Sequence, residues 1–142
     1  MHMIDVGHKP AVARRATAEA VIETTPEAAR AMVDGRTPKG DVAALARAAG
    51  IMAAKRTPDL VLLAHPLPIS SVAVDISVDA DRGRVHVRTT VSTTARTGVE
   101  MEALTAAGIA ALNVYDMLKA LDRNQVITGV RLLEKTKGAA PS

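Results

Sequence analysis

The chain has no cysteine and almost no aromatic side chains among its 142 residues. Without cysteine it can form no disulfide, no thiolate ligand for zinc and no cysteine nucleophile. Tyr115 is the only aromatic residue. Proteins that bind RNA or single-stranded DNA stack bases on aromatic rings, so we expect no nucleic-acid partner.

Long hydrophobic runs are also missing. The longest apolar segments, 103–115 and 60–74, are shorter than the roughly 20 residues that cross a bilayer, and Pro66 and Pro68 interrupt the second. The first twenty residues carry charges and no apolar run, so we expect no signal peptide. These absences predict a soluble, cytoplasmic protein with no membrane partner.

The core must therefore consist of Val, Leu, Ile, Ala and Met, which suffices for one domain over residues 1–142. Alanine-rich cores are typical of helices that approach closely, and often of burial against another copy of the chain. Eighteen Lys and Arg against fifteen acids give a net charge of +3. This mild excess fits either an ordinary surface or a site for a small anion.

Apolar periodicity predicts an α+β sandwich with helices on one face of an antiparallel sheet. Alternating apolar residues predict four strands, at 15–23, 71–78, 84–94 and 125–135. Helical spacing and capping residues predict three helices, at 25–34, 42–56 and 98–122. Residues 1–13 are expected to form an arm, and 60–70 an apolar loop. In the second helix the residues expected to face the core are Val42, Leu45, Ala49 and Met52.

Asp116 and Lys119 are three residues apart on the last helix and therefore adjacent on its surface. This spacing is typical of an ordinary helical ion pair. Two observations favour a functional role: Lys119 lies at the apolar end of the helix, and residues 103–115 carry no charge. Lys39, beside a glycine just ahead of a helix N-terminus, is similar to an anion cradle but lacks a full phosphate-loop pattern.

Three further residues are weaker candidates. His65 is a lone loop histidine, a type that is usually structural or exposed, and no second ligand stands at metal-binding spacing, so we expect no metal. Lys55 has an alternative role in the favourable interaction of a cation with a helix C-terminus. Arg96, just before Thr97, is a candidate phosphate contact.

Two glutamates mark the start of the last helix. Thr97-x-x-Glu100 predicts a capping box, and Glu102 points away from Glu100 around the helix. Glu102 and Asp116 are fourteen residues apart, which is ~21 Å along the helix axis. If both serve one site, a second subunit must supply one of them. The residues alone therefore favour acid–base chemistry on a small phosphorylated substrate.

Several motifs occur together in a specific order and spacing. They are Met32-Val33-Asp34-Gly35-Arg36, Lys39-Gly40-Asp41-Val42, Ala53-Ala54-Lys55-Arg56-Thr57, His65-Pro66-Leu67, the segment TGVEMEALTA from Thr97 to Ala106, Tyr115-Asp116-Met117 and Val130-Arg131-Leu132-Leu133. With them the chain resembles the cyclic pyranopterin monophosphate synthases of molybdenum-cofactor biosynthesis over essentially its whole length.

The resemblance implies a ferredoxin-like subunit in a homohexamer, a trimer of dimers with active sites between subunits. It implies a lyase that converts 3′,8-cyclo-7,8-dihydro-GTP, made by a radical SAM enzyme of the same pathway, to cyclic pyranopterin monophosphate and pyrophosphate. No cofactor is expected. The implied catalytic residues are Asp116, Lys119 and Lys39. The implied substrate-binding residues are Leu63, Ala64, His65, Met101 and Glu102, with Lys55, Arg96 and Lys135 as additional expected cations for the pyrophosphate.

The chain departs from the family pattern in three places. Ala64 stands where the family usually has cysteine, Ala95-Arg96 replaces Gly-Lys, and Lys135-Thr136-Lys137-Gly138 reduces a Lys-x-Gly-Gly-Lys pattern. The alternative hypothesis is a non-catalytic oligomeric paralogue that binds a nucleotide or phosphate. The retained Lys39, Asp116 and Lys119 argue against it, because a pure binder needs no acid–base set.

Overall fold

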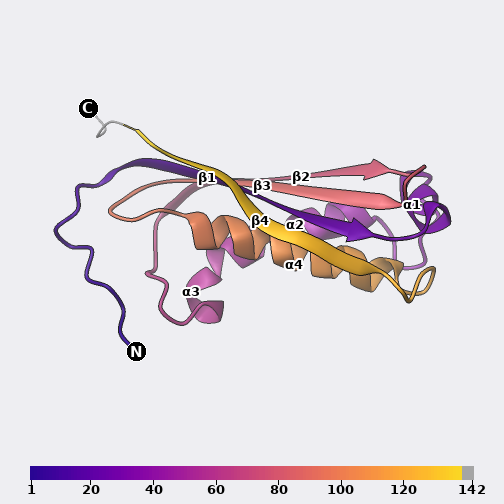
Figure 1. Ribbon diagram of the computed structural model, residues 1–142, viewed down its shortest axis with the longest axis horizontal. Coiled ribbons are helices and arrows are strands. Elements are labelled where there is room, and N and C mark those ends of the chain that lie inside the picture. The colour runs from indigo at the N-terminus through magenta and orange to yellow at the C-terminus, as the bar shows by residue number, and fades with distance from the viewer. Residues whose placement is uncertain (139–142) are drawn as a thin grey trace.

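The computed structural model describes residues 1–138. Four strands form one antiparallel sheet in the order β2-β3-β1-β4, and helices cover one of its faces (Figure 1). The strands are β1 (Val12–Glu23), β2 (Ile69–Asp79), β3 (Arg84–Ala95) and β4 (Val126–Lys137). The helices are α1 (Pro26–Val33), α2 (Val42–Lys55), α3 (Thr57–Leu60) and α4 (Glu100–Leu118). The predicted α+β, ferredoxin-like class is confirmed.

The expected elements are all present, with two differences that bear on the site. β1 begins at Val12, inside the segment expected to be an arm. The short helix α3 was not expected. Its first residue, Thr57, is fully buried, and its hydroxyl donates at 3.0 Å to the carbonyls of Ala53 and Ala54. This contact ends α2 and leads the chain into the loop that carries His65.

Small side chains let the helices pack closely. The sheet face under the helices carries alanines of β1 and valines of β3, and α4 adds five fully buried alanines, Ala103, Ala106, Ala107, Ala110 and Ala111. A Cβ on Gly50 of α2 would lie 3.2 Å from the carbonyl oxygen of Ala106. The close approach expected from the alanine-rich composition is therefore present between α2 and α4.

The expected core face of α2 is wrong at two positions. Leu45 is 48% exposed and Met52 is 52% exposed. The residues that α2 buries are Val42, Ala46, Gly50, Ala53 and Ala54. Because α2 lies so near α4, only small side chains fit between them, and the large ones point outward.

The long helix α4 sets the distance between the two ends of the molecule. The buried hydroxyl of Thr89 in β3 donates to the carbonyl of Ala103 at 2.7 Å, which fixes the first turn of α4 on the sheet. From there the 19-residue helix runs beneath the sheet, so its first and last turns lie at opposite ends of the molecule (Figure 1). Over residues 1–138, no helix combines the length and apolarity needed to cross a membrane.

Two glycines with nearly the same positive φ give a matched test of steric strain. Gly83 has φ +64°, and a Cβ there would lie 2.3 Å from the carbonyl oxygen of Thr24. Gly129 has φ +63°, and a Cβ there would meet nothing within 4 Å. We expect Gly129→Ala to cost ~1 kcal/mol for the left-handed conformation, and Gly83→Ala ~2–4 kcal/mol because a clash is added. Chemical denaturation measures both, and equal losses would contradict the clash.

Candidate active site

A carboxylate between two lysines lies at the C-terminal end of α4. The Lys119 Nζ atom is 2.8 Å from Asp116 Oδ1, and the Lys39 Nζ atom is 3.0 Å from Asp116 Oδ2. Lys39 also donates to the backbone carbonyl of Asp116 at 3.3 Å. The structure therefore brings together the three residues expected to be catalytic, although Lys39 is far from the other two in the sequence.

Local structure explains how Lys39 reaches α4. Lys39 precedes Gly40, whose φ of +109° is a conformation that favours glycine. Asp41 then caps α2 by accepting a hydrogen bond from the Ala44 amide at 3.0 Å. The turn and the cap place Lys39 beside the last turn of α4, where its ammonium group also satisfies a carbonyl that the helix leaves unpaired.

Both lysines hold Asp116 in its ionised form. Hydrogen bonds from Lys119 and then Lys39 lower the pKa of the Asp116 carboxyl below its ordinary value of 3.8. All three side chains are about half exposed, so a ligand can reach them. A carboxylate flanked by two ammonium groups can accept a proton while the lysines donate hydrogen bonds or neutralise negative charge.

A cavity of about 390 Å³ lies at the other end of α4. Three segments form its wall: the N-terminal arm, the loop after α3, and the start of α4. The lining residues are His2, Ile4, Val6, Lys9, Leu63, Ala64, His65, Leu67, Thr97, Gly98, Glu100, Met101 and Glu102. All five residues expected from the resemblance to bind substrate therefore line one cavity.

Glu102 is the buried acid of this cavity, with 3% of its surface exposed. Burial raises the pKa of its carboxyl, the nearby Glu100 carboxylate adds to the rise, and its own backbone N–H partly offsets it. Burial of a carboxylate without a cationic partner costs free energy. A ligand with N–H donors would supply the missing partners, which is what a binding residue of this kind can do.

Replacing Glu102 with glutamine should therefore stabilise the free protein near neutral pH. An acid whose folded pKa is raised makes the folded state bind more protons, so stability falls as pH rises through the window above 4.5, its ordinary pKa. We expect Glu102→Gln to raise Tm at pH 7 by about 2–5 °C, with the gain shrinking as pH approaches 4.5. Thermal denaturation across pH 4–8 checks this. Glu134→Gln, on exposed β4, is the control, and a lower Tm for Glu102→Gln at pH 7 would contradict the prediction.

The three additional cations fall in different places. Lys135 Nζ is 3.4 Å from Glu100 Oε1, in a hollow next to the cavity that Arg14 and Lys137 also line. Arg96 donates to the backbone carbonyl of Gly7 at 2.8 Å. Lys55 lines a separate hollow on the outer side of α2. Of the three expected phosphate contacts, only Lys135 therefore lines a hollow beside the cavity.

Two features differ from the expectations drawn from the sequence. The capping box is wrong, because α4 begins at Glu100 and its cap residue, Val99, makes no side-chain hydrogen bond. Glu100 pairs with Lys135 instead. The arm, to which the sequence analysis assigned no role, contributes His2 and Lys9 to the lining of the cavity. The signal available in the sequence was Lys9, which is followed by Arg14 and Arg15 of β1 with no acid between them.

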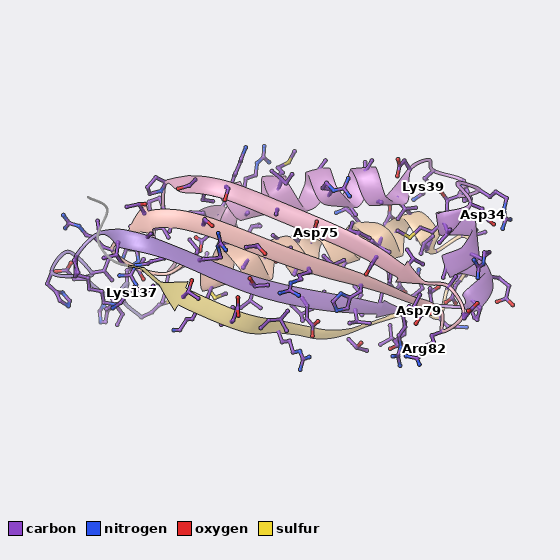
Figure 2. The ribbon with its side chains drawn as sticks, turned by 90° about the horizontal axis from the view of Figure 1, so that it is seen from above. Asp34, Lys39, Asp75, Asp79, Arg82 and Lys137 are labelled. Carbon is purple, nitrogen blue, oxygen red and sulfur yellow. The ribbon has the colours of Figure 1, made fainter. Side chains whose placement is uncertain are left out.

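The two groups of residues do not meet within one chain. Asp116 and its lysines lie at one end of α4, and the cavity with Glu102 lies at the other. Figure 2 labels Lys39, which pairs with Asp116, and Lys137, which lines the hollow next to the cavity, at opposite ends of the sheet. Among the described residues 1–138, no three His, Asp or Glu side chains are arranged to hold a metal ion.

Sequence comparisons give the chain's relatives. The model of the MoaC family matches residues 3–138. The chain is 53% identical over 138 residues to the cyclic pyranopterin monophosphate synthase of Herpetosiphon aurantiacus, covering 97% of this chain and 84% of that protein. It is 50% identical over 137 residues to the enzyme of that name from Cereibacter sphaeroides, covering 96% and 86%. It is 52% identical over 136 residues to the cyclic pyranopterin monophosphate synthase of Deinococcus radiodurans, covering 96% of this chain and 80% of that protein. The chain belongs to the MoaC family.

Proposed function

We propose that this chain is a cyclic pyranopterin monophosphate synthase acting as one domain in the cytoplasm. It takes 3′,8-cyclo-7,8-dihydro-GTP, the product of a radical SAM partner enzyme, and forms cyclic pyranopterin monophosphate with release of pyrophosphate. The family membership supports this activity. The observation that carries it is the Asp116 carboxylate held at 2.8 and 3.0 Å between two lysines.

The Asp116 cluster suits the proton transfers of this reaction. Opening the imidazole ring of a purine and closing a pterin ring require protons to be removed and returned at nitrogen and carbon atoms. In this proposal the ionised Asp116 accepts a proton, and Lys39 and Lys119, which pair with it in the free protein, donate hydrogen bonds to the reacting atoms. Their charge also offsets negative charge that develops on oxygen.

The cavity suits recognition of the substrate. The buried Glu102 carboxylate is an acceptor for the N–H donors of a guanine-derived edge. Lys9 on the wall, with Arg14, Lys135 and Lys137 in the adjacent hollow, gives a concentration of positive charge on one side. Closing the cyclic phosphate expels pyrophosphate, and such a cluster stabilises that leaving group.

A complete site requires two copies of the chain. Asp116 and Glu102 are separated by ~21 Å along α4, too far for one small substrate to reach both in one subunit. We propose that each site joins the Asp116 cluster of one copy to the cavity of another, in a homohexamer built as a trimer of dimers. The apolar side chains exposed on the helices, Leu45, Met52 and Leu112, supply surface for such contacts.

The direct test is turnover of the cyclised dihydro-GTP. The protein is incubated with this compound, and pyrophosphate and the pterin product are measured. The alternative function, a non-catalytic oligomer that binds a nucleotide or phosphate, predicts binding without product. Binding with no product above background would therefore overturn the enzyme and support the paralogue.

A further inference from the structure

The N-terminal arm is held to the rest of the molecule by two arginines. Arg14, in β1, donates through Nε to the carbonyl of Ala95 at 3.0 Å and through Nη2 to the carbonyl of Arg96 at 3.2 Å. Arg96 in turn donates through Nη1 to the carbonyl of Gly7 at 2.8 Å. The first arginine fixes the loop between β3 and α4, and the second ties the arm to that loop.

The tied part of the arm is a compact turn. The amide of Gly7 donates to Asp5 Oδ1 at 2.8 Å, and the amide of Lys9 donates to the carbonyl of Val6 at 3.0 Å. Ile4, Val6 and Lys9 from this turn line the cavity that contains Glu102. Arg96 itself is not among the residues, all within 1–138, that line this cavity. Its guanidinium therefore contacts the arm at Gly7, which does not line the cavity, while Ile4, Val6 and Lys9 of the same turn do.

We infer that Arg96 is a positioning residue, which keeps the arm closed over the cavity and so holds Lys9 at its wall. This inference rests on the proposed function for its effect on substrate, and it replaces the expectation that Arg96 contacts phosphate directly. The arm is otherwise weakly attached, because Met1, Met3 and Ile4 are exposed and bury little surface. One charge-assisted hydrogen bond is thus a large share of what holds it.

The first test follows the arm without using substrate. In Arg96→Met we expect hydrogen exchange at the Gly7 and Lys9 amides to be about tenfold faster, because the arm opens more often. Arg96→Lys, which retains a charged donor, should restore most of the protection. Arg82→Met is the matched control: Arg82 is an exposed arginine at the far end of the sheet (Figure 2), and its loss should leave arm exchange unchanged. Unchanged exchange in Arg96→Met would overturn the inference.

The second test separates positioning from direct contact. Arg96→Met should raise KM about tenfold and change kcat by less than about twofold, and adding it to Lys9→Met should cause no further loss. Asp5→Ala should also raise KM, because it loosens the same turn. A direct electrostatic contact predicts the opposite sign for Asp5→Ala, since removing an acid favours anion binding.

Each outcome decides a different claim. The positioning role would be overturned if the rise in KM of the Arg96→Met and Lys9→Met double variant were the product of the rises in the two single variants. A lower KM in Asp5→Ala would also overturn it. If the wild-type protein shows no turnover at all, the proposed function fails. The exchange measurement then still decides whether Arg96 holds the arm.

Discussion

Replacing Asp116 with asparagine is expected to lower kcat by about 10²–10⁴-fold, the usual contribution of a positioned acid–base group. Asparagine has nearly the same shape, and its oxygen can still accept a hydrogen bond from one lysine. It cannot take a proton in the neutral pH range, so the step that needs a base stops. Steady-state release of pyrophosphate measures the loss, and circular dichroism and gel filtration should show unchanged folding and assembly.

Asp81→Asn is the matched control for this substitution. Asp81 also pairs with a cation, at 3.1 Å from Arg30, but its side chain is 92% exposed and it lies in the turn between β2 and β3. The control should turn over normally and change stability by less than about 0.5 kcal/mol. An Asp116→Asn variant that retained half of the wild-type rate would show that the carboxylate is not the base.

The pH dependence of the cluster follows from the same contacts. Because both lysines lower the pKa of Asp116 below 3.8, the ion pairs are complete above that ordinary value and are lost as pH falls through the folded value. In Lys39→Met one of the two hydrogen bonds is removed, so the pKa of Asp116 should rise. The acid limb of the pH–rate profile should therefore move to higher pH. An unchanged acid limb would show that Lys39 does not influence the pKa of Asp116.

The hairpin of β2 and β3 could be predicted because each of these strands alternates more buried with more exposed residues. In β3, Val85, Val87 and Val91 point to the helices and alternate with polar residues such as His86 and Thr90. That period of two residues is a local property, so a single sequence reveals it. The three residues expected to be catalytic, Asp116, Lys119 and Lys39, were identified in a different way, through motifs, since no local rule relates Lys39 to Asp116.

Other features depend on contacts between distant segments. Leu45 and Met52 have the spacing of a core stripe, yet α2 buries its small residues because Gly50 brings it close to α4. Thr97-x-x-Glu100 has the pattern of a capping box, but Glu100 begins the helix and pairs with Lys135 of β4. In both cases the local sequence pattern is compatible with more than one structure, and tertiary packing decides which one forms.

Mixing two inactive variants is expected to restore activity if each site is shared between copies. One variant carries Asp116→Asn, and the other carries Glu102→Gln with His65→Ala, so that each loses one end of α4. In a two-fold pair containing one chain of each kind, one site receives both defects and the other receives none. Random pairing makes half of the pairs mixed, so about a quarter of all sites should be intact. Co-expression of the two chains and measurement of pyrophosphate release tests this against parents with almost no activity.

The same substitutions placed in one chain provide the control that makes the result decisive. When the triple variant is co-expressed with wild type, every mixed pair has one defect in each of its two sites. Only pairs of two wild-type chains then work, so activity should again be about a quarter, where sites contained in single chains would give about a half. Single-chain sites also predict no recovery when the two partial variants are mixed. The two experiments move in opposite directions under the two arrangements, so loss of assembly alone cannot imitate the shared site. Recovered activity in the first mixture requires a site that combines the last turn of α4 from one subunit with the first turn of α4 from a neighbour.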